Sequence, residues 1–187
     1  MKLRLENRRD RSSLGGERAV MAPKVLGYWD IRGLGEPIRY LLAHAGVPYE
    51  DKRYSYGKGP EPSRDEWLAE KYKLDLDFPN LPYLIDGDVR MTQSQAILRY
   101  LGRKLGLVPK DEETLRRVDM LEHQVVKTLG PSTFRKGYPV LEEYCQRVAA
   151  LPGLKQYLAS DRFKPWPIWS PYAKALSAHS KPPADDC

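Results

Sequence analysis

The hydrophobic pattern of this chain changes at Gly106, and that change limits the folds it can adopt. Before Gly106, short apolar runs that suit β-strands alternate with stretches whose apolar residues recur at helical spacing. After Gly106 helical spacing dominates, at 111–129, at 140–151 and over a short stretch from Pro152. The pattern predicts an α/β domain at residues 22–106 followed by an all-helical domain at 107–187.

The first domain is expected to run strand, helix, strand, then helix, strand, strand, helix. The strands are expected at 24–29, 48–54, 81–86 and 89–91, and the helices at 37–45, 63–72 and 94–105. Pro37 suits the first turn of a helix and Gly46 its end. Ser63 and Glu66 predict a capping box for the second helix, and Ser94 a cap for the third. One mixed sheet with helices packed on it is therefore expected.

The composition is typical of a folded, soluble protein. Hydrophobic residues make up 41% and charged residues 30% of the chain. No apolar run approaches the roughly 20 residues that a membrane helix needs. The formal net charge is +6, but the first twenty residues hold six basic and three acidic side chains, which is half of the excess. No helix-turn-helix, zinc or aromatic-basic repeat accompanies the charge, so no nucleic-acid partner is expected.

Residues 1–21 are expected to be an extension in front of the folded part. The segment is polar and rich in arginine, and Met21 is followed at once by strand-like sequence. A transit peptide is an alternative, but transit peptides avoid acidic residues and this segment has three.

Cysteine and histidine usage indicates no metal and no disulfide framework. Cys145 and Cys187 lie far apart in the sequence, and the three histidines have no ligand spacing. A reducing, cytoplasmic setting without a bound cofactor is the expectation.

The turn after the first strand carries the sequence Tyr28-Trp29-Asp30-Ile31-Arg32-Gly33. With residues 76–87, residues 92–94 and the Gly- and Pro-rich loop before Arg64, it resembles the mu class of cytosolic glutathione S-transferases. The similarity runs from Val25 to about Gln124 and resumes from Tyr138 to Phe163. The resemblance implies a thioredoxin-like domain followed by a helical domain, and conjugation of reduced glutathione to small hydrophobic electrophiles.

The resemblance implies that Tyr28 activates the thiol of glutathione. A free thiol with a pKa of about 8.5 is mostly protonated at neutral pH. A tyrosine hydroxyl can donate a hydrogen bond to sulfur, and the N-terminus of the following helix stabilises negative charge nearby. By position alone, Tyr28 would be interpreted as an ordinary strand aromatic. No cysteine stands in this turn, so the dithiol exchange of thioredoxin is excluded.

The resemblance also implies which residues hold glutathione, a tripeptide with two carboxylates and one ammonium. An indole N–H and cations on or beside the second helix suit the glycyl carboxylate, and backbone N–H groups at the start of the third suit the γ-glutamyl carboxylate. The implied binding residues are Tyr28, Trp29, Leu34, Arg64, Trp67, Lys71, Asn80, Leu81, Pro82, Gln93 and Ser94. The Leu81–Pro82 bond is implied to be cis. Without the family order, Arg64 and Lys71 would be ordinary surface charges.

Other matched positions concern a second subunit, because the resemblance implies a homodimer. Phe78 matches an aromatic key that inserts into the partner's helical domain, and the alternative is a core aromatic. Arg99, Asp119 and Glu122 would face the two-fold axis, or else form solvated helix surface.

The second domain is shorter than the family pattern between Gln124 and Tyr138. The end of one helix, the whole next helix and a capping box are missing. Lys127 replaces an acid that the family extends to the partner's glutathione, and the second tyrosine of the electrophile pocket has no counterpart. Ser170 does stand at a matching pocket position.

The missing stretch should leave the apolar stripe of helix 111–129 exposed. Three outcomes stay open: an active transferase, a glutathione- or hydrophobe-binding protein without turnover, and a poorly folded variant.

Overall fold

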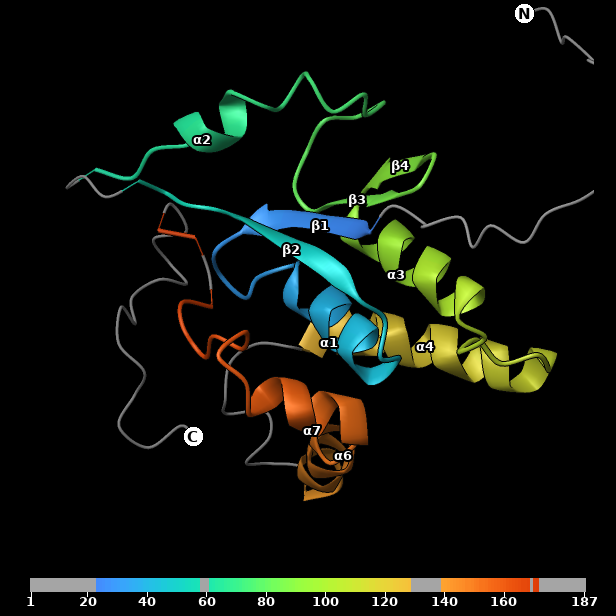
Figure 1. The fold of residues 1–187 in the computed structure, drawn as a ribbon. Coiled ribbons are helices and arrows are strands. Elements are labelled where there is room, and N and C mark those ends of the chain that lie inside the picture. Colours follow the sequence, from blue (N-terminus) through green and yellow to red (C-terminus); the bar gives the residue numbers. More distant parts are fainter. Residues whose placement is uncertain (1–22, 58–60, 129–138, 169, 172–187) are drawn as a thin grey trace, which may run out of the picture.

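The computed structural model describes residues 23–57, 61–128, 139–168, 170 and 171 (Figure 1). The first part contains β1 (Lys24–Trp29), α1 (Glu36–His44), β2 (Tyr49–Tyr54), α2 (Asp65–Leu68), β3 (Tyr83–Asp86), β4 (Val89–Thr92) and α3 (Ser94–Lys104). The second contains α4 (Glu112–Thr128), α6 (Pro139–Ala149) and α7 (Pro152–Leu158). The predicted order is confirmed. The extension at 1–21 lies outside the described residues, as do the side chains of 123–142.

The sheet is mixed, as predicted, with strand order β2-β1-β3-β4. β1 runs parallel to β2 and antiparallel to β3, and β3 and β4 form a hairpin. Gly87 has φ +63° in the hairpin turn, a conformation that glycine adopts without steric cost. This arrangement brings the end of β1 and the loop before β3 to the same side of the molecule.

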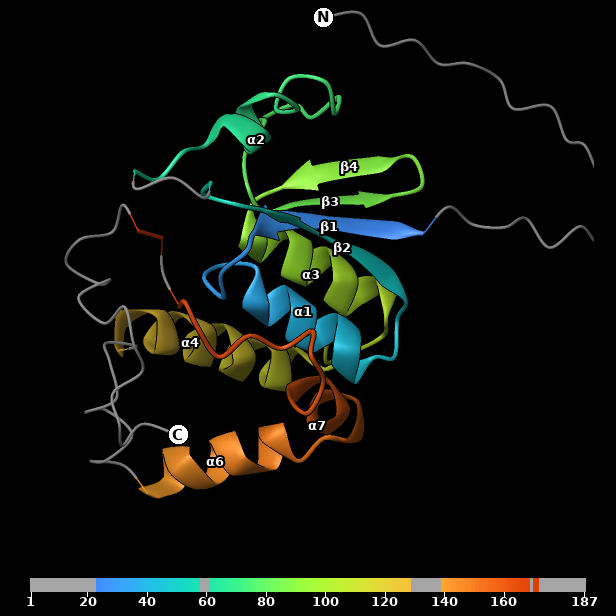
Figure 2. The ribbon, with the colours of Figure 1, turned by 60° about the vertical axis from the view of Figure 1, so that its left-hand side comes forward.

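The sheet buries a separate cluster on each face. Figure 2 shows α1 and α3 together on one face, with α2 on the other side. The cluster under α1 and α3 contains Leu26, Ile38, Leu42, Leu84, Ile97 and Leu101, all fully buried. Burial of each such aliphatic side chain contributes about 1.5–3 kcal/mol. The helical periodicities of α1 and α3 therefore predicted their buried faces correctly.

The capping box predicted at Ser63 and Glu66 is wrong. The α2 helix begins later, with Arg64 as its N-cap. The Ser63 N–H donates to the carbonyl of Tyr56 at 2.7 Å, so it is not available to the Glu66 carboxylate. Glu66 instead accepts from the Ser55 N–H at 2.7 Å. Contacts with the loop at Ser55 and Tyr56 have therefore replaced the predicted hydrogen bond between Ser63 and Glu66.

Ser94 is the first residue of α3 rather than its cap, so that prediction is also wrong. Gln93 occupies the cap position with φ 72°, and no side chain caps the helix. The backbone turns sharply at Gln93, which is an uncommon conformation for a residue with a side chain.

The helical part contacts the first domain mainly through α7. Tyr157 on α7 is buried and donates to Glu36 at 3.1 Å. A Cβ atom on Gly153 would lie 2.2 Å from the carbonyl oxygen of Ala43, so the two helices touch backbone to backbone. By contrast, Val118 and Leu121 on α4 are exposed, Leu121 by 63%, as the missing stretch predicted. None of the described helices is long and apolar enough to cross a membrane.

Candidate active site

Tyr28 lies at the end of β1 with its side chain buried and its hydroxyl held by the turn that follows. The Leu34 N–H donates to the hydroxyl oxygen at 3.0 Å. A Cβ atom on Gly33 would lie 2.6 Å from that hydroxyl, and one on Gly35 would lie 2.5 Å from the ring. Only glycine allows the turn to wrap so closely around the tyrosine. The sequence reasoning missed both glycines, although their spacing on either side of Leu34 was a visible signal.

The surroundings of Tyr28 keep its hydroxyl protonated. Burial raises the pKa of Tyr28 above its ordinary value, and the Leu34 N–H and the charge of Arg39 offset only part of that rise. Because the oxygen already accepts from Leu34, the hydroxyl proton is free to point elsewhere. The geometry suits a group that donates a hydrogen bond to a neighbouring anion.

Arg39 supports the same turn from inside and was not predicted from the sequence. It is fully buried, and its guanidinium donates to the carbonyl of Ile31 at 2.9 Å. Glu36 and Asp51 each accept from it at 3.1 Å. Helical periodicity misses such a residue, because a buried arginine interrupts the apolar face that the pattern seeks. Its several partners balance its charge and fix the backbone beside Tyr28.

Three of the predicted binding residues gather in one cluster on the second face of the sheet. Tyr28, Trp67 and Leu81 are buried together there. Trp67 stacks on Tyr83 with ring centroids 6.1 Å apart. The Leu81–Pro82 bond is cis, in the isomer that the resemblance implied.

Gln93 and Ser94 lie where α3 begins, so backbone N–H groups without helical partners are located there. A cavity of about 160 Å³ adjoins this helix start and is lined in part by Phe78, Thr92 and Gln93. Asn80 accepts from the Leu81 N–H at 2.9 Å, which orients the loop before β3. These residues offer polar groups for one end of an extended ligand.

The remaining predicted binding residues are partly or fully exposed on the first domain. Trp29 stacks on Tyr56 with ring centroids 4.3 Å apart, and Leu34 is half exposed. Arg64 occupies the N-cap position of α2 and is exposed, whereas Lys71 follows α2 and lies over the ring of Tyr72 at 5.1 Å. Their binding roles stay predictions.

The positions assigned to a subunit interface are mostly exposed. Phe78 is 75% exposed, so the alternative of a core aromatic is wrong. Arg99 and Glu122 form an ion pair at 3.0 Å within the chain, across α3 and α4, and Asp119 is exposed. The side chain of Lys127 lies outside those described.

Ser170 follows a segment that reaches the turn beside Tyr28. The carbonyl of Ile168 accepts from the Gly33 N–H at 2.8 Å. Ser170 is half-buried, two residues beyond that contact.

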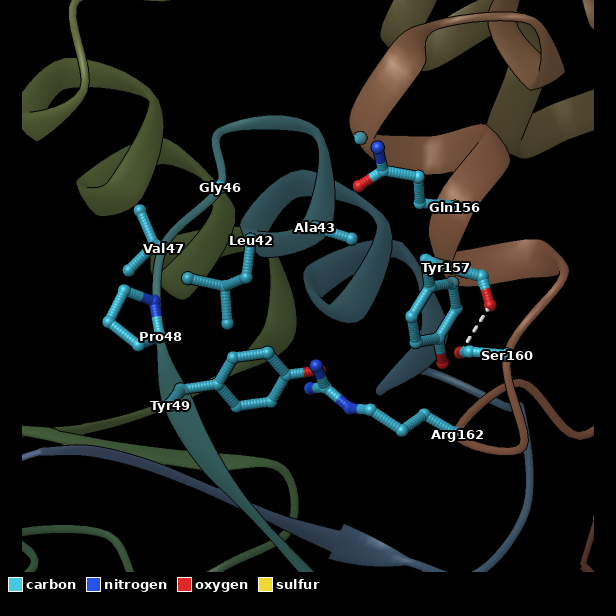
Figure 3. Close-up of a pocket in the computed structure, with 11 residues that line it drawn as sticks. Leu42, Ala43, Gly46, Val47, Pro48, Tyr49, Gln156, Tyr157, Ser160 and Arg162 are labelled. Carbon is cyan, nitrogen blue, oxygen red and sulfur yellow. Dashed lines mark hydrogen bonds between the residues drawn. The ribbon is translucent and has the colours of Figure 1, made fainter.

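A larger cavity, of about 320 Å³, lies away from Tyr28 (Figure 3). It is bounded by the end of α1, the start of β2 and α7, and Tyr49 and Arg162 lie face to face along one side. Tyr49 pairs with Lys24 at the start of β1, whereas Tyr28 stands near its end. This cavity is therefore separate from the candidate site. Among the described residues, no three His, Cys, Asp or Glu side chains are grouped to hold a metal.

Comparison with known proteins agrees with this geometry. Residues 24–103 match the family described as "Glutathione S-transferase, N-terminal domain". The solved structure of the glutathione S-transferase Blo t 8 is 30% identical, with a TM-score of 0.67, and the alignment covers 80% of this chain and 98% of that one. The chain belongs to the glutathione S-transferase family. The structure of the Ascaris lumbricoides glutathione S-transferase, 24% identical with a TM-score of 0.60, shares the fold.

The first half of the chain is similar to mu-class members of that family. Glutathione S-transferase Mu 6 of Mus musculus is 60% identical over 106 residues, which is 57% of this chain and 49% of the relative. Glutathione S-transferase Mu 2 of Rattus norvegicus is 58% identical over the same share of each chain. The chain thus spans about half the length of the curated relatives it matches.

Proposed function

We propose that this chain binds reduced glutathione and transfers it to small hydrophobic electrophiles, with Tyr28 as the catalytic residue. The observation that carries the proposal is the buried Tyr28 hydroxyl, whose oxygen accepts from the Leu34 N–H and whose raised pKa keeps it a donor. A hydrogen bond from this hydroxyl to the glutathione sulfur favours the thiolate over the thiol. The thiolate is the form that attacks a carbon electrophile.

The ligand would extend from the start of α3 to the region of α2. In this arrangement the γ-glutamyl carboxylate meets Gln93, the Ser94 hydroxyl, and the N–H groups of Ser94 and the next residues. The glycyl carboxylate meets Arg64, Trp67 and Lys71, which supply cations and an indole N–H. Leu81 and Asn80 lie between them and would bind the middle of the tripeptide. The cavity beside Gln93 supports this placement.

The electrophile would bind on the other side of Tyr28, against Leu34 and the tail that carries Ser170. The contact of Ile168 with Gly33 supports this placement. Leu34 is half exposed and offers an apolar surface there. Because Leu34 is apolar, we expect the electrophile that binds there to be hydrophobic.

We also propose a cytoplasmic homodimer. The exposed Phe78 would insert into the partner's helical domain, and Arg99, Asp119 and Glu122 would lie near the two-fold axis. The exposure of Val118, Met120 and Leu121 on α4 supports a partner, because monomeric proteins rarely expose large contiguous apolar patches.

Two assays test the proposed function and separate it from binding without turnover. The parent chain should be retained on immobilised glutathione and should conjugate glutathione to a reactive aryl halide. Retention without conjugation would leave only the binding function, and failure in both assays would overturn the proposal.

The binding residues are tested by calorimetry with reduced glutathione. Arg64→Ala and Ser94→Ala should each weaken binding at least several-fold, since a charge-assisted hydrogen bond contributes about 1.5–3 kcal/mol. Arg116→Ala, on the exposed surface of α4, is the matched control and should bind as the parent does. Undiminished affinity in both site variants would show that glutathione lies elsewhere.

A further inference from the structure

Residues 161–168, here called the tail segment, run from the end of α7 to the turn beside Tyr28 (Figure 2). The N–H groups of Arg32 and Gly33 donate to the carbonyls of Pro167 and Ile168, at 2.9 and 2.8 Å. The next N–H along the chain, that of Leu34, donates to the Tyr28 hydroxyl. One short turn therefore joins the tail segment to the hydroxyl that we assign to catalysis.

Ionic contacts hold the tail segment in this position. The Lys164 ammonium donates to a carboxylate oxygen of Asp30 at 2.7 Å. Arg53 from β2 donates to the same oxygen at 3.0 Å and to the carbonyl of Arg162 at 2.9 Å. Asp30 is the second residue after Tyr28, so the ion pair anchors the tail at the base of the turn.

An aromatic contact adds to these bonds. The Arg32 guanidinium lies 5.6 Å from the centre of the Phe163 ring. Phe163 also meets the ring of Tyr157, with centroids 6.0 Å apart. The tail segment is thus fixed to both the turn and α7, the helix that packs on α1.

The charge on Asp30 is secure near neutral pH. Burial raises the pKa of Asp30, but the hydrogen bonds from Lys164 and Arg53 outweigh that effect and hold it below its ordinary value. The side chains of Lys164 and Asp30 are 42% and 37% exposed. An ion pair this exposed contributes little to the free energy of unfolding. Its effect is to hold the tail segment in one position.

We propose that Lys164 is a positioning residue for Tyr28. By holding the tail segment on Asp30, it keeps the Pro167 and Ile168 carbonyls against the turn, and so keeps the Leu34 N–H on the Tyr28 oxygen. A hydroxyl whose oxygen accepts a hydrogen bond donates more strongly, because bonds in a chain polarise one another. This inference rests on the proposed function. It assigns to the C-terminal tail a part in the activation of the thiol.

The test compares Lys164→Met with Lys155→Met, which removes an exposed lysine from α7. In the ligand-free chain, the amides of Arg32, Gly33 and Leu34 should exchange with solvent several-fold faster in Lys164→Met only. With glutathione bound, the pKa of its thiol should rise by about half a unit, which matches the loss of part of one hydrogen bond. The kcat for conjugation should fall while the KM for glutathione stays unchanged. Lys164→Arg should restore the parent values.

The outcomes separate this inference from the proposed function. If both variants exchange alike at these amides, Lys164 does not position the turn, whatever the conjugation rate. If the parent chain fails to bind glutathione, the proposed function fails, and an NMR titration of Tyr28 itself decides the inference. A higher Tyr28 pKa in Lys164→Met supports it, and an unchanged pKa overturns it.

Discussion

The helices α3 and α4 have similar amphipathic patterns, but the apolar face of α3 is buried and that of α4 is exposed. On α3, Ile97 and Leu101 are fully buried against the sheet and α1. On α4, Val118 and Leu121 are exposed. Periodicity says only that a helix has an apolar face, and whether that face is covered depends on partners elsewhere in the chain. The first domain supplies the apolar partners of α3, whereas this chain lacks the stretch of the family pattern against which α4 would pack.

The same contrast appears in the ion pairs. Arg39 is fully buried between Glu36 and Asp51, whereas the Arg99–Glu122 pair that joins α3 and α4 is partly exposed. Removing a buried cation leaves two carboxylates without it, and an exposed pair is weakened by water and salt.

The largest effect is expected from Arg39→Leu. Breaking a buried ion pair costs about 3–5 kcal/mol, so this variant should lose much of the free energy of unfolding. Arg99→Leu should change it by about 1 kcal/mol or less. Urea denaturation of both variants measures the difference. Equal losses would mean that the buried and the exposed ion pair contribute equally to the free energy of unfolding.

A smaller effect is expected from truncating the apolar faces. Leu101→Ala should lower the free energy of unfolding by about 3 kcal/mol, because it opens a cavity in a closed core. Leu121→Ala should change it by about 0.5 kcal/mol or less in the monomer. Denaturation at low protein concentration makes the comparison. A large loss at Leu121 that grows with protein concentration would show instead that a second subunit covers α4.

The smallest effect concerns pH. Burial raises the pKa of Asp86, but hydrogen bonds from Lys104, Tyr100 and Lys24 outweigh it, and the pKa lies below its ordinary value. A carboxyl with a lowered pKa in the folded state contributes stability above its unfolded pKa of about 3.9, and that contribution is lost as the pH falls through the folded value. The parent should therefore lose stability below about pH 4, and Asp86→Asn should lose less over the same range. Parallel curves for the two proteins would show that Asp86 carries none of the acid sensitivity.

The sequence predicted the fold more fully than it predicted the site. Strand and helix order followed from apolar periodicity and from Pro37, Gly46 and Gly87, because these signals are local. The predicted capping box was wrong because a loop contact took its place, the Ser63 N–H being bonded to the carbonyl of Tyr56. The predicted cap at Ser94 was wrong because Gln93, with φ 72°, occupies the cap position.

The support of Tyr28 could not be predicted from the sequence, because the residues that supply it lie far from Tyr28 along the chain. Arg39 is eleven residues from Tyr28 in the chain, and the tail segment is more than a hundred residues away. Nothing in a local pattern indicates that the carbonyls of Pro167 and Ile168 would bond to the turn. The motif predicts the role of Tyr28. The groups that hold its hydroxyl in place can be identified only from the three-dimensional structure.

If Tyr28 activates the thiol of glutathione, the pKa of the bound thiol must depend on the Tyr28 hydroxyl. The absorbance of the bound thiolate is titrated against pH in the parent and in Tyr28→Phe. Glutathione should still bind to Tyr28→Phe with similar affinity, while the thiol pKa should rise by about one unit or more, as expected when a hydrogen bond to an anion is lost. An unchanged thiol pKa in a variant that still binds glutathione would show that Tyr28 does not activate the thiol.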